Sequence, residues 1–441
     1  MSPRTCAQAL AAAQALGLER LDAQWLLLHA LGKPADARAW LLAHDTDALD
    51  DAVARRVESL VCGDWLELVP LHCPGVAMDR RTFLASSLVT PLAGAVRAEA
   101  RVARFLYVVC PGIRDYLEFG GAGILVFDID DGHKFVKRIA TVASKVAKPR
   151  NIKGVVASAA TKKLHFTTPE ALYCIDLVTE KTDWGKELPQ GCDRLAATPD
   201  GKTLFVPSFE KDIWNVVDAA TGKVTTDIET KSGAHNTVCG LDGKRVYLAG
   251  LKSPFLFVAD TATNKVVDKV GPFAASIRPF TVNGSQTLCF VNVNELLGFE
   301  IGDLKTGKKL HRVEVPDVKT GAVKRHGCPS HGIGLTPDEK EVWVVDAFNE
   351  RVHVFDATAM PPKYATSVKL REQPGWVTFG LDGKYVYPST GEVIDTATKK
   401  IVATLADEKG GPVHSEKMVE IHIKDGVPVA TGDQFGLGRK R

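Results

Sequence analysis

The sequence lacks any apolar run long enough to cross a membrane, since no stretch approaches the roughly 18 to 20 uninterrupted apolar residues of a spanning helix. A dominant charge of one sign is also missing, because 55 Lys and Arg nearly balance 53 Asp and Glu and leave a formal net charge of +2. Such a balance gives no bulk attraction to nucleic acid. We therefore expect a soluble protein with no membrane span and no nucleic-acid partner.

Recognisable catalytic motifs are absent as well. The sequence contains neither a Gly-x-Ser-x-Gly nucleophile turn nor the Cys-x-x-Cys-His motif that attaches haem covalently. These absences leave open whether the protein is an enzyme, and we expect no cofactor.

A repeated pattern is present instead. Asp200-Gly201-Lys202 is followed by an apolar strand and then by Asp218 to Lys223, and Asp242-Gly243-Lys244 is followed in the same way by Asp260 to Lys265. When looser copies are included, successive copies of the repeat lie roughly 40 to 54 residues apart in the sequence. This is the length of one four-stranded propeller blade. The pattern predicts an all-β fold.

Each repeat contains a strand that ends at its later turn, the one that begins at Asp218 or Asp260 in the two clearest copies. Seven such strands occur, which indicates seven blades. These strands are 124–128, 172–176, 213–218, 255–260, 297–301, 352–356 and 393–395. The Asp that closes most of them precedes a tight turn, so we expect it to accept backbone N–H bonds rather than to take part in catalysis. Residues 104–109 lack an inner strand, and 418–426 would supply it and close the ring.

Residues 104 to about 436 resemble the YVTN-type (YncE-like) seven-bladed β-propellers. These propellers are in turn similar to the cytochrome d1 domain and to WD40-like propellers. The resemblance is carried by Thr198-Pro-Asp-Gly-Lys202 and by the segment Pro329 to Asp338. It implies a propeller over residues 101–441. It does not select a function, because such propellers include lactonases, lyases, electron-transfer partners and binding modules.

Residues 1–60 have a different composition, with apolar residues at helical spacing such as Leu21, Trp25 and Leu28. The segments 20–32 and 38–45 resemble the N-terminal helical domain of the release-factor glutamine methyltransferases (PrmC/HemK), and the likeness runs over residues 8–57. The Gly-rich loop and the Asn-Pro-Pro-Tyr motif of that family are missing. We therefore do not expect methyltransferase activity.

A signal-like segment follows a linker at 61–77. Residues 78–100 begin with Met78-Asp-Arg-Arg-Thr-Phe-Leu84, continue with a mildly apolar run and end at Ala98-Glu-Ala100, as in a twin-arginine export signal. We expect translation to start at Met78 and the mature protein, beginning near residue 99, to be periplasmic or secreted. If residues 1–77 are really translated, the protein is expected to be cytoplasmic.

Six cysteines follow the signal-like segment, which allows fifteen pairings in an oxidising compartment. Several lie inside apolar strand runs, as Cys289 does in Thr287 to Val291. At such positions we expect buried free thiols.

The loops before the inner strands of a propeller meet at one mouth of its channel, so residues at these positions are candidate ligand-binding residues. The set is Arg150, Lys153, Arg194, His235, Arg278, His331, Trp376, His414 and Lys417. The set is basic and rich in histidine, which favours a small carboxylate or phosphate as the ligand. Arg194 and Arg278 would each donate a pair of hydrogen bonds to this anion. A water-filled rim and a site for a protein partner are the alternatives.

Two further alternatives use the same mouth. His326, Cys328 and His331 are ligand types for a metal or haem iron, although their spacing matches no standard zinc site. His235 or His331 could serve as acid or base in a lactonase or lyase. We expect a monomer, since ring closure leaves no free inner edge.

Overall fold

The computed structural model describes residues 102–323 and 325–440, together with 5–8, 10, 27, 28 and 31 near the N-terminus. The chain divides into two compact units, Met1–Val96 and Arg97–Arg441, and each is described by itself. The expected helices of 1–60, the linker and the signal-like segment fall almost wholly outside the described residues, so those assignments stay predictions. Within the part that is described, no helix is both long and apolar enough to span a bilayer.

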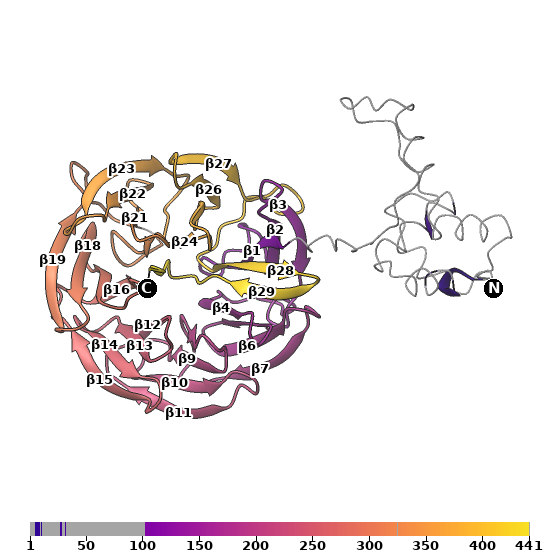
Figure 1. The fold of residues 1–441 in the computed structure, drawn as a ribbon, viewed down its shortest axis with the longest axis horizontal. Coiled ribbons are helices and arrows are strands. Elements are labelled where there is room, and N and C mark those ends of the chain that lie inside the picture. Colours follow the sequence, from indigo (N-terminus) through magenta and orange to yellow (C-terminus); the bar gives the residue numbers. More distant parts are fainter. Residues whose placement is uncertain are drawn as a thin grey trace, which may run out of the picture. The chain divides into compact units, whose positions relative to one another are not determined.

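The second unit consists of seven β-sheets arranged around a common centre (Figure 1). Six sheets have four strands and one has five. This arrangement confirms the predicted all-β, seven-bladed propeller.

Each blade runs from an inner strand near the axis to an outer strand at the rim. The inner strands are β28 (Met418–Lys424), β4 (Gly154–Ser158), β8 (Ala196–Ala197), β12 (Ala234–Cys239), β16 (Ile277–Val282), β20 (Ile333–Leu335) and β24 (Val377–Phe379). The second strands are β1 (Ala103–Cys110), β5 (Lys163–Thr167), β9 (Thr203–Pro207), β13 (Arg245–Gly250), β17 (Leu288–Val293), β21 (Glu341–Asp346) and β25 (Tyr385–Pro388). The third strands are β2 (Gly123–Asp128), β6 (Ala171–Asp176), β10 (Ile213–Asp218), β14 (Leu256–Asp260), β18 (Gly298–Asp303), β22 (Arg351–Asp356) and β26 (Glu392–Asp395). The outer strands are β3 (Lys134–Ile139), β7 (Thr182–Glu187), β11 (Val224–Glu229), β15 (Lys265–Val270), β19 (Lys308–Glu314), β23 (Lys363–Lys369) and β27 (Lys400–Thr404).

Burial follows the position of each strand in its blade. Second and third strands are packed on both faces by neighbouring blades, so they read as continuous apolar runs, and Trp214 in β10 and Trp343 in β21 are fully buried. Outer strands are largely exposed and carry charges, as in the Lys-Val-Val-Asp-Lys-Val of β15. Charged side chains along these edges oppose pairing with another chain.

The Asp residues that end the third strands are structural, as expected. Asp218 Oδ1 accepts the backbone N–H and the hydroxyl of Thr221, at 2.9 and 2.6 Å. Asp260 Oδ1 accepts the backbone N–H of Thr263 at 2.9 Å in the corresponding turn. The hydrogen bonds from Thr221 hold the pKa of Asp218 below its ordinary value.

The ring closes between the two ends of the propeller unit. Strand β28 pairs antiparallel with β1, with Tyr107 opposite Val419 and Ala103 opposite Ile423. This confirms the predicted joining of 104–109 with 418–426. The structure adds a fifth strand, β29 (Val427–Thr431), which pairs with β28 on its free side and was not predicted.

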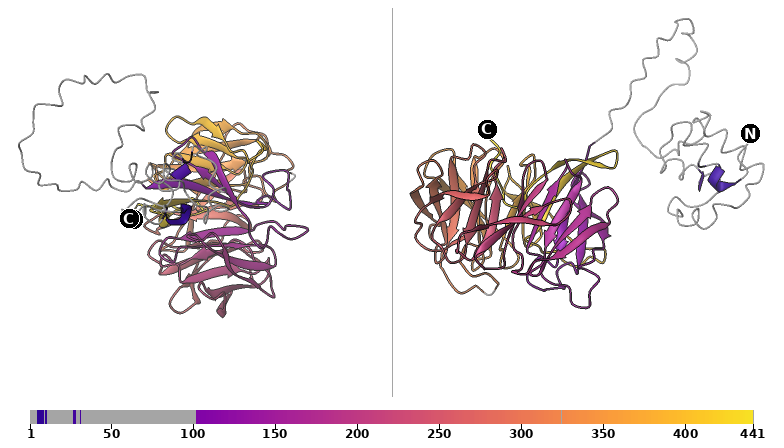
Figure 2. Two further views of the ribbon diagram at one scale, coloured as in Figure 1. Left: turned by 90° about the vertical axis from the view of Figure 1, so that its right-hand side faces the viewer. Right: turned by 90° about the horizontal axis from the view of Figure 1, so that it is seen from below.

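Residues 432–440 form a C-terminal tail that crosses the channel where the inner strands end. Gly436 O accepts hydrogen bonds from Leu335 N at 2.8 Å and Thr281 Oγ1 at 2.7 Å, and Val155 N donates to Gln434 Oε1 at 3.1 Å. These partners belong to three different blades, so the tail passes over the axis, and Figure 1 places the C-terminus at the centre of the ring. Figure 2 shows the ring edge-on with the C-terminus at one face.

The cysteines of the propeller are buried free thiols: Cys110, Cys174, Cys192, Cys239, Cys289 and Cys328. This confirms the expectation for Cys289, where burial raises the pKa of the thiol to about 12. These thiols therefore contribute as small apolar groups rather than as nucleophiles.

Candidate functional site

A cavity of about 200 Å³ lies at the end of the ring away from the tail, where the inner strands begin. Its lining residues come from the first residues of several inner strands, from the loops before inner strands, and from the loops that follow β1, β9 and β13. The basic ones are Arg114, Lys153, Arg194, Arg278, Arg325 and Lys417, and the acidic ones are Glu210 and Glu416. The cavity is therefore strongly cationic, although the whole chain is almost neutral.

Six of the nine predicted ligand-binding residues line this cavity: Lys153, Arg194, His235, Arg278, His331 and Lys417. Their convergence follows from the repeat, because equivalent positions of successive blades meet near the axis. That they bind a ligand stays a prediction.

The other three predicted residues lie elsewhere. Arg150 is half exposed and forms an ion pair with Glu170 at 2.7 Å. Trp376 is buried and donates from Nε1 to Gln434 O of the tail, so it lies between the cavity and the tail. His414 is buried with its ring stacked on Phe119 at a centroid distance of 4.3 Å.

A buried ion network surrounds Glu416. Its Oε2 accepts from Arg194 Nη2 and from Lys417 Nζ, the latter at 2.9 Å. The Arg194 guanidinium lies 3.9 Å from the centre of the Trp376 ring, which adds a cation–π contact. Burial alone would raise the pKa of Glu416, but Lys417 and Arg194 hold it well below its ordinary value, so the carboxylate is ionised.

Lys417 is unusual because its ammonium group is almost completely buried. Its Nζ donates to Gly112 O at 2.9 Å as well as to Glu416. Burial lowers the pKa of Lys417 to about 7, since the nearby charges of Arg194 and Lys153 offset part of the attraction of Glu416. The charge of the cavity therefore changes close to neutral pH.

A second charged pair involves Asp193, which has no exposed surface. Its Oδ2 accepts from His235 Nδ1 at 2.6 Å, and its Oδ1 lies 3.6 Å from Lys153 Nζ. Burial opposes ionisation of Asp193, yet His235 and Lys153 outweigh it and keep the pKa of Asp193 below its ordinary value. Burial also lowers the pKa of His235, which favours a neutral ring with its proton on Nδ1.

Arg278 is held at the rim of the cavity by two hydrogen bonds. Its Nε donates to Asn294 Oδ1 at 2.6 Å and its Nη2 to Gly327 O at 3.2 Å. These bonds fix the guanidinium while Nη1 stays free of hydrogen bonds to any described residue. Unlike Arg194, Arg278 has no carboxylate partner in the described part of the chain.

Three groups with metal-ligand atoms gather beside this network. One atom each of His326, His331 and Glu416 lies within 4.8 Å of the other two. Two of these residues were predicted as metal candidates, whereas Cys328 points away and donates from Sγ to Ser330 O at 3.1 Å.

The surroundings of these three groups fit a metal poorly. The carboxylate of Glu416 is already shared by ion pairs with Arg194 and Lys417, and the rings of His326 and His331 stack on each other at 4.9 Å. A divalent cation would add positive charge to a cavity with six basic side chains. The donor set therefore suits a bound metal less well than the electrostatics suit an anion.

Sequence reasoning missed Arg114, Arg325 and Glu210 as lining residues. Arg114 lies between β1 and β2, and Arg325 lies in the long connection between β19 and β20. Such loops carry no repeat position that could place them.

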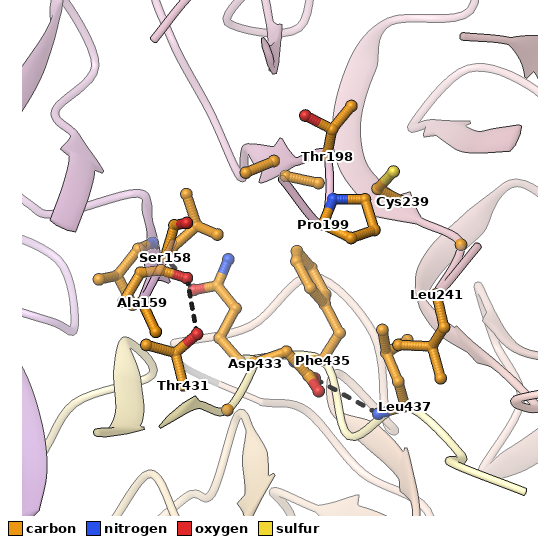
Figure 3. A pocket seen from close by; sticks show the side chains of 18 of the residues that line it. Ser158, Ala159, Thr198, Pro199, Cys239, Leu241, Thr431, Asp433, Phe435 and Leu437 are labelled. Atoms are coloured by element: carbon orange, nitrogen blue, oxygen red, sulfur yellow. Dashed lines mark hydrogen bonds between the residues drawn. The ribbon is translucent and has the colours of Figure 1, made fainter. Parts of the chain in front are cut away.

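Figure 3 shows a second cavity, of about 310 Å³, at the tail end of the channel. Phe435 and Leu437 of the tail face Pro199 and Leu241 across it. Asp433 Oδ1 accepts from the backbone N–H groups of Phe435 and Leu437, at 2.8 and 3.3 Å, and so orders the tail. This cavity has a mixed lining that includes many apolar side chains, unlike the cationic cavity.

Comparisons with known proteins support the fold and the N-terminal resemblance. The chain is a β-propeller similar to the solved structure of Kuenenia stuttgartiensis hydrazine synthase, with 14% identity over 62% of this chain and 89% of that chain and a TM-score of 0.51. At this identity the likeness shows the fold alone. Residues 4–62 match the PrmC N-terminal domain, in agreement with the resemblance over 8–57. No curated protein matches the chain.

Proposed function

We propose that this protein is a binding module that holds a small anion, a carboxylate or a phosphate, in the cationic cavity at its channel mouth. The observation that supports this most directly is the lining of six basic and two acidic side chains around a volume of about 200 Å³. Low-dielectric walls concentrate the field of such a cavity. The volume suits a small ligand rather than a polymer.

The basic residues of this site differ in whether a carboxylate already pairs with them. Arg194 and Lys417 share Glu416, whereas Arg278 has only neutral hydrogen-bond partners in the described part of the chain. Lys153 Nζ is 3.6 Å from Asp193, which also interacts with His235. We therefore expect Arg278 to make the strongest contact with an anion and Lys153 to add to it.

Isothermal titration calorimetry at low ionic strength tests this proposal, with oxalate and inorganic phosphate as probes and neutral glycerol as a control. Both anions should bind with one-to-one stoichiometry, and glycerol should not. Affinity should fall as salt is added, because screening weakens the attraction. Absence of binding by either anion would refute the proposal.

The metal alternative has its own test. Elemental analysis of the purified protein should find no stoichiometric metal. A stoichiometric metal that is lost in His331→Ala would favour a metal or haem protein over an anion-binding module.

We also propose that the propeller is exported through a twin-arginine signal. The support is the segment Met78 to Leu84, the apolar run after it and the Ala-x-Ala pattern at residues 98–100. Mass spectrometry of the native protein should place the N-terminus near residue 99. Peptides from residues 1–60 in that protein would overturn export from this signal and favour a cytoplasmic location.

A further inference from the structure

His235 lines the cavity and has one ring nitrogen without a hydrogen-bond partner among the described residues. The ring is almost fully buried, lines the cavity and uses Nδ1 for its bond to Asp193 at 2.6 Å. The nitrogen on the other side of the ring, Nε2, is buried and has no hydrogen-bond partner among the described residues. An unpaired buried polar atom is costly to a protein unless something completes it.

The surroundings decide whether Nε2 donates or accepts. Because the carboxylate of Asp193 can only accept from Nδ1, a neutral ring must carry its proton there and leave a lone pair on Nε2. Burial is the main cause that lowers the pKa of His235, and the charges of Lys153 and Arg194 act in the same direction against the attraction of Asp193, so the ring is neutral. Nε2 is therefore a hydrogen-bond acceptor on a residue that lines a cavity rich in basic side chains.

We propose that the ligand of this cavity is a hydroxy carboxylate, whose carboxylate meets the basic side chains while its hydroxyl donates a hydrogen bond to His235 Nε2. This inference rests on the proposed anion-binding function and narrows it. An amino acid would also offer a donor, but its ammonium group would enter a cavity lined by six basic side chains. A neutral hydroxyl satisfies Nε2 without that repulsion.

Three small probes separate the carboxylate from the hydroxyl. Acetate has the carboxylate alone, glycolate adds a hydroxyl, and fluoroacetate replaces this hydroxyl with a fluorine of similar size that cannot donate. Calorimetric titration of the protein should give glycolate an affinity about fivefold to tenfold higher than fluoroacetate, the effect of one net hydrogen bond. Fluoroacetate and acetate should bind about equally.

Asp193→Asn tests whether His235 is the acceptor. In this variant the amide oxygen would face Lys153, so the amide NH₂ group would donate to His235 Nδ1 and move the ring proton to Nε2. Nε2 could then no longer accept from a hydroxyl. The hydroxyl of glycolate would have to reverse its role and accept from Nε2, so the preference for glycolate over fluoroacetate should fall, while acetate still binds.

A matched control exists in another blade. Asp346 accepts from His353 Nε2 at 3.0 Å, and both residues are buried away from the cavity. Asp346→Asn alters an Asp–His pair of the same kind and should leave the glycolate preference unchanged. His235→Phe, checked by thermal melting, removes the ring nitrogen altogether and should abolish the preference, whether or not Asp193→Asn folds.

The outcomes separate a failure of the hydroxyl contact with His235 from a failure of anion binding. Equal binding of glycolate and fluoroacetate by the unaltered protein, or a glycolate preference that persists in Asp193→Asn and His235→Phe, would overturn the hydroxyl contact and leave anion binding intact. Failure of oxalate, acetate and glycolate alike would refute the anion site itself.

Discussion

The two ends of the channel are built from the same seven repeats and yet differ in chemistry. At the tail end, Asp433 accepts from the backbone N–H of Phe435 with one oxygen and from Arg439 Nη2 with the other, at 2.8 and 2.9 Å. At the mouth, Asp193 has a hydrogen-bond partner only for Oδ2, and Oδ1 is buried without one among the described residues. In the tail, both oxygens of Asp433 are paired and Gln434 Nε2 is buried without a partner among the described residues, whereas Asp193, Arg194 and His235 at the mouth together keep four such atoms.

This difference distinguishes residues that stabilise the fold from residues that form the candidate site. Phe435 and Leu437 extend the apolar core into the channel, as a structural element does. Arg194 and His235 instead hold buried nitrogens that no described residue pairs, next to a cavity. Native proteins rarely keep such groups unless a ligand or a mechanism uses them.

The largest expected effect comes from breaking the buried ion network at the mouth. Arg194→Ala removes one partner of Glu416 and leaves this buried carboxylate with Lys417 as its remaining hydrogen-bond partner among the described residues. Loss of one partner of a buried pair costs about 3 to 5 kcal/mol in the free energy of unfolding. Chemical denaturation should show this loss, while Arg245→Ala, which breaks a partly exposed pair with Asp260, should cost less than about 1 kcal/mol. Equal effects of the two variants would contradict the network.

Removing apolar packing at the tail end should have the next largest effect. Phe435 is buried and contacts Trp376 edge-on at a centroid distance of 6.0 Å. Phe435→Ala should lower the free energy of unfolding by about 3 kcal/mol, the lower end for a buried aromatic ring. The affinity for oxalate should be unchanged when the variant is folded. A large loss of affinity would mean that the two ends are coupled.

Arg278→Ala should affect binding rather than stability. Because Arg278 is partly exposed and lacks a carboxylate partner in the described chain, its loss should change the free energy of unfolding by no more than about 0.5 kcal/mol. Oxalate binding should weaken by about 1.5 to 3 kcal/mol, the scale of a charged hydrogen bond. Calorimetry of Arg278→Ala beside Arg245→Ala measures this, and an unchanged affinity would remove Arg278 from the site.

The smallest expected effect is on the pH dependence of binding. The pKa of Lys417 is about 7, so raising the pH from about 6 to about 9 removes a positive charge from the cavity. Burial lowers the pKa values of His235, His326 and His331, so these rings do not oppose the trend. Oxalate affinity should therefore fall with rising pH in the unaltered protein and stay nearly flat in Lys417→Met. Affinity that rises with pH would contradict this assignment.

The fold could be predicted from sequence because the repeat specifies it locally. Asp200-Gly201-Lys202 and its copies mark turns, and the apolar runs between them mark buried strands, so seven blades and their closure followed. The fifth strand β29 and the tail could not be found this way, since each occurs once. Their positions depend on contacts with inner strands of other blades.

The candidate site could be predicted only where it follows the repeat. His235 and Lys417 occupy equivalent blade positions and line the cavity as expected. Trp376 also occupies such a position, but its ring turns to the tail, which sequence did not reveal. Arg114 and Arg325 reach the cavity from irregular loops, whose paths depend on tertiary contacts rather than on local pattern.

A crystal structure of the protein grown with oxalate tests the central claim most directly. We expect the anion between Arg278 and Lys153 in the cationic cavity, with the tail across the other end of a closed seven-bladed ring. Oxalate bound elsewhere, or an empty cavity at saturating oxalate with Glu416 still paired to Arg194, would contradict the account.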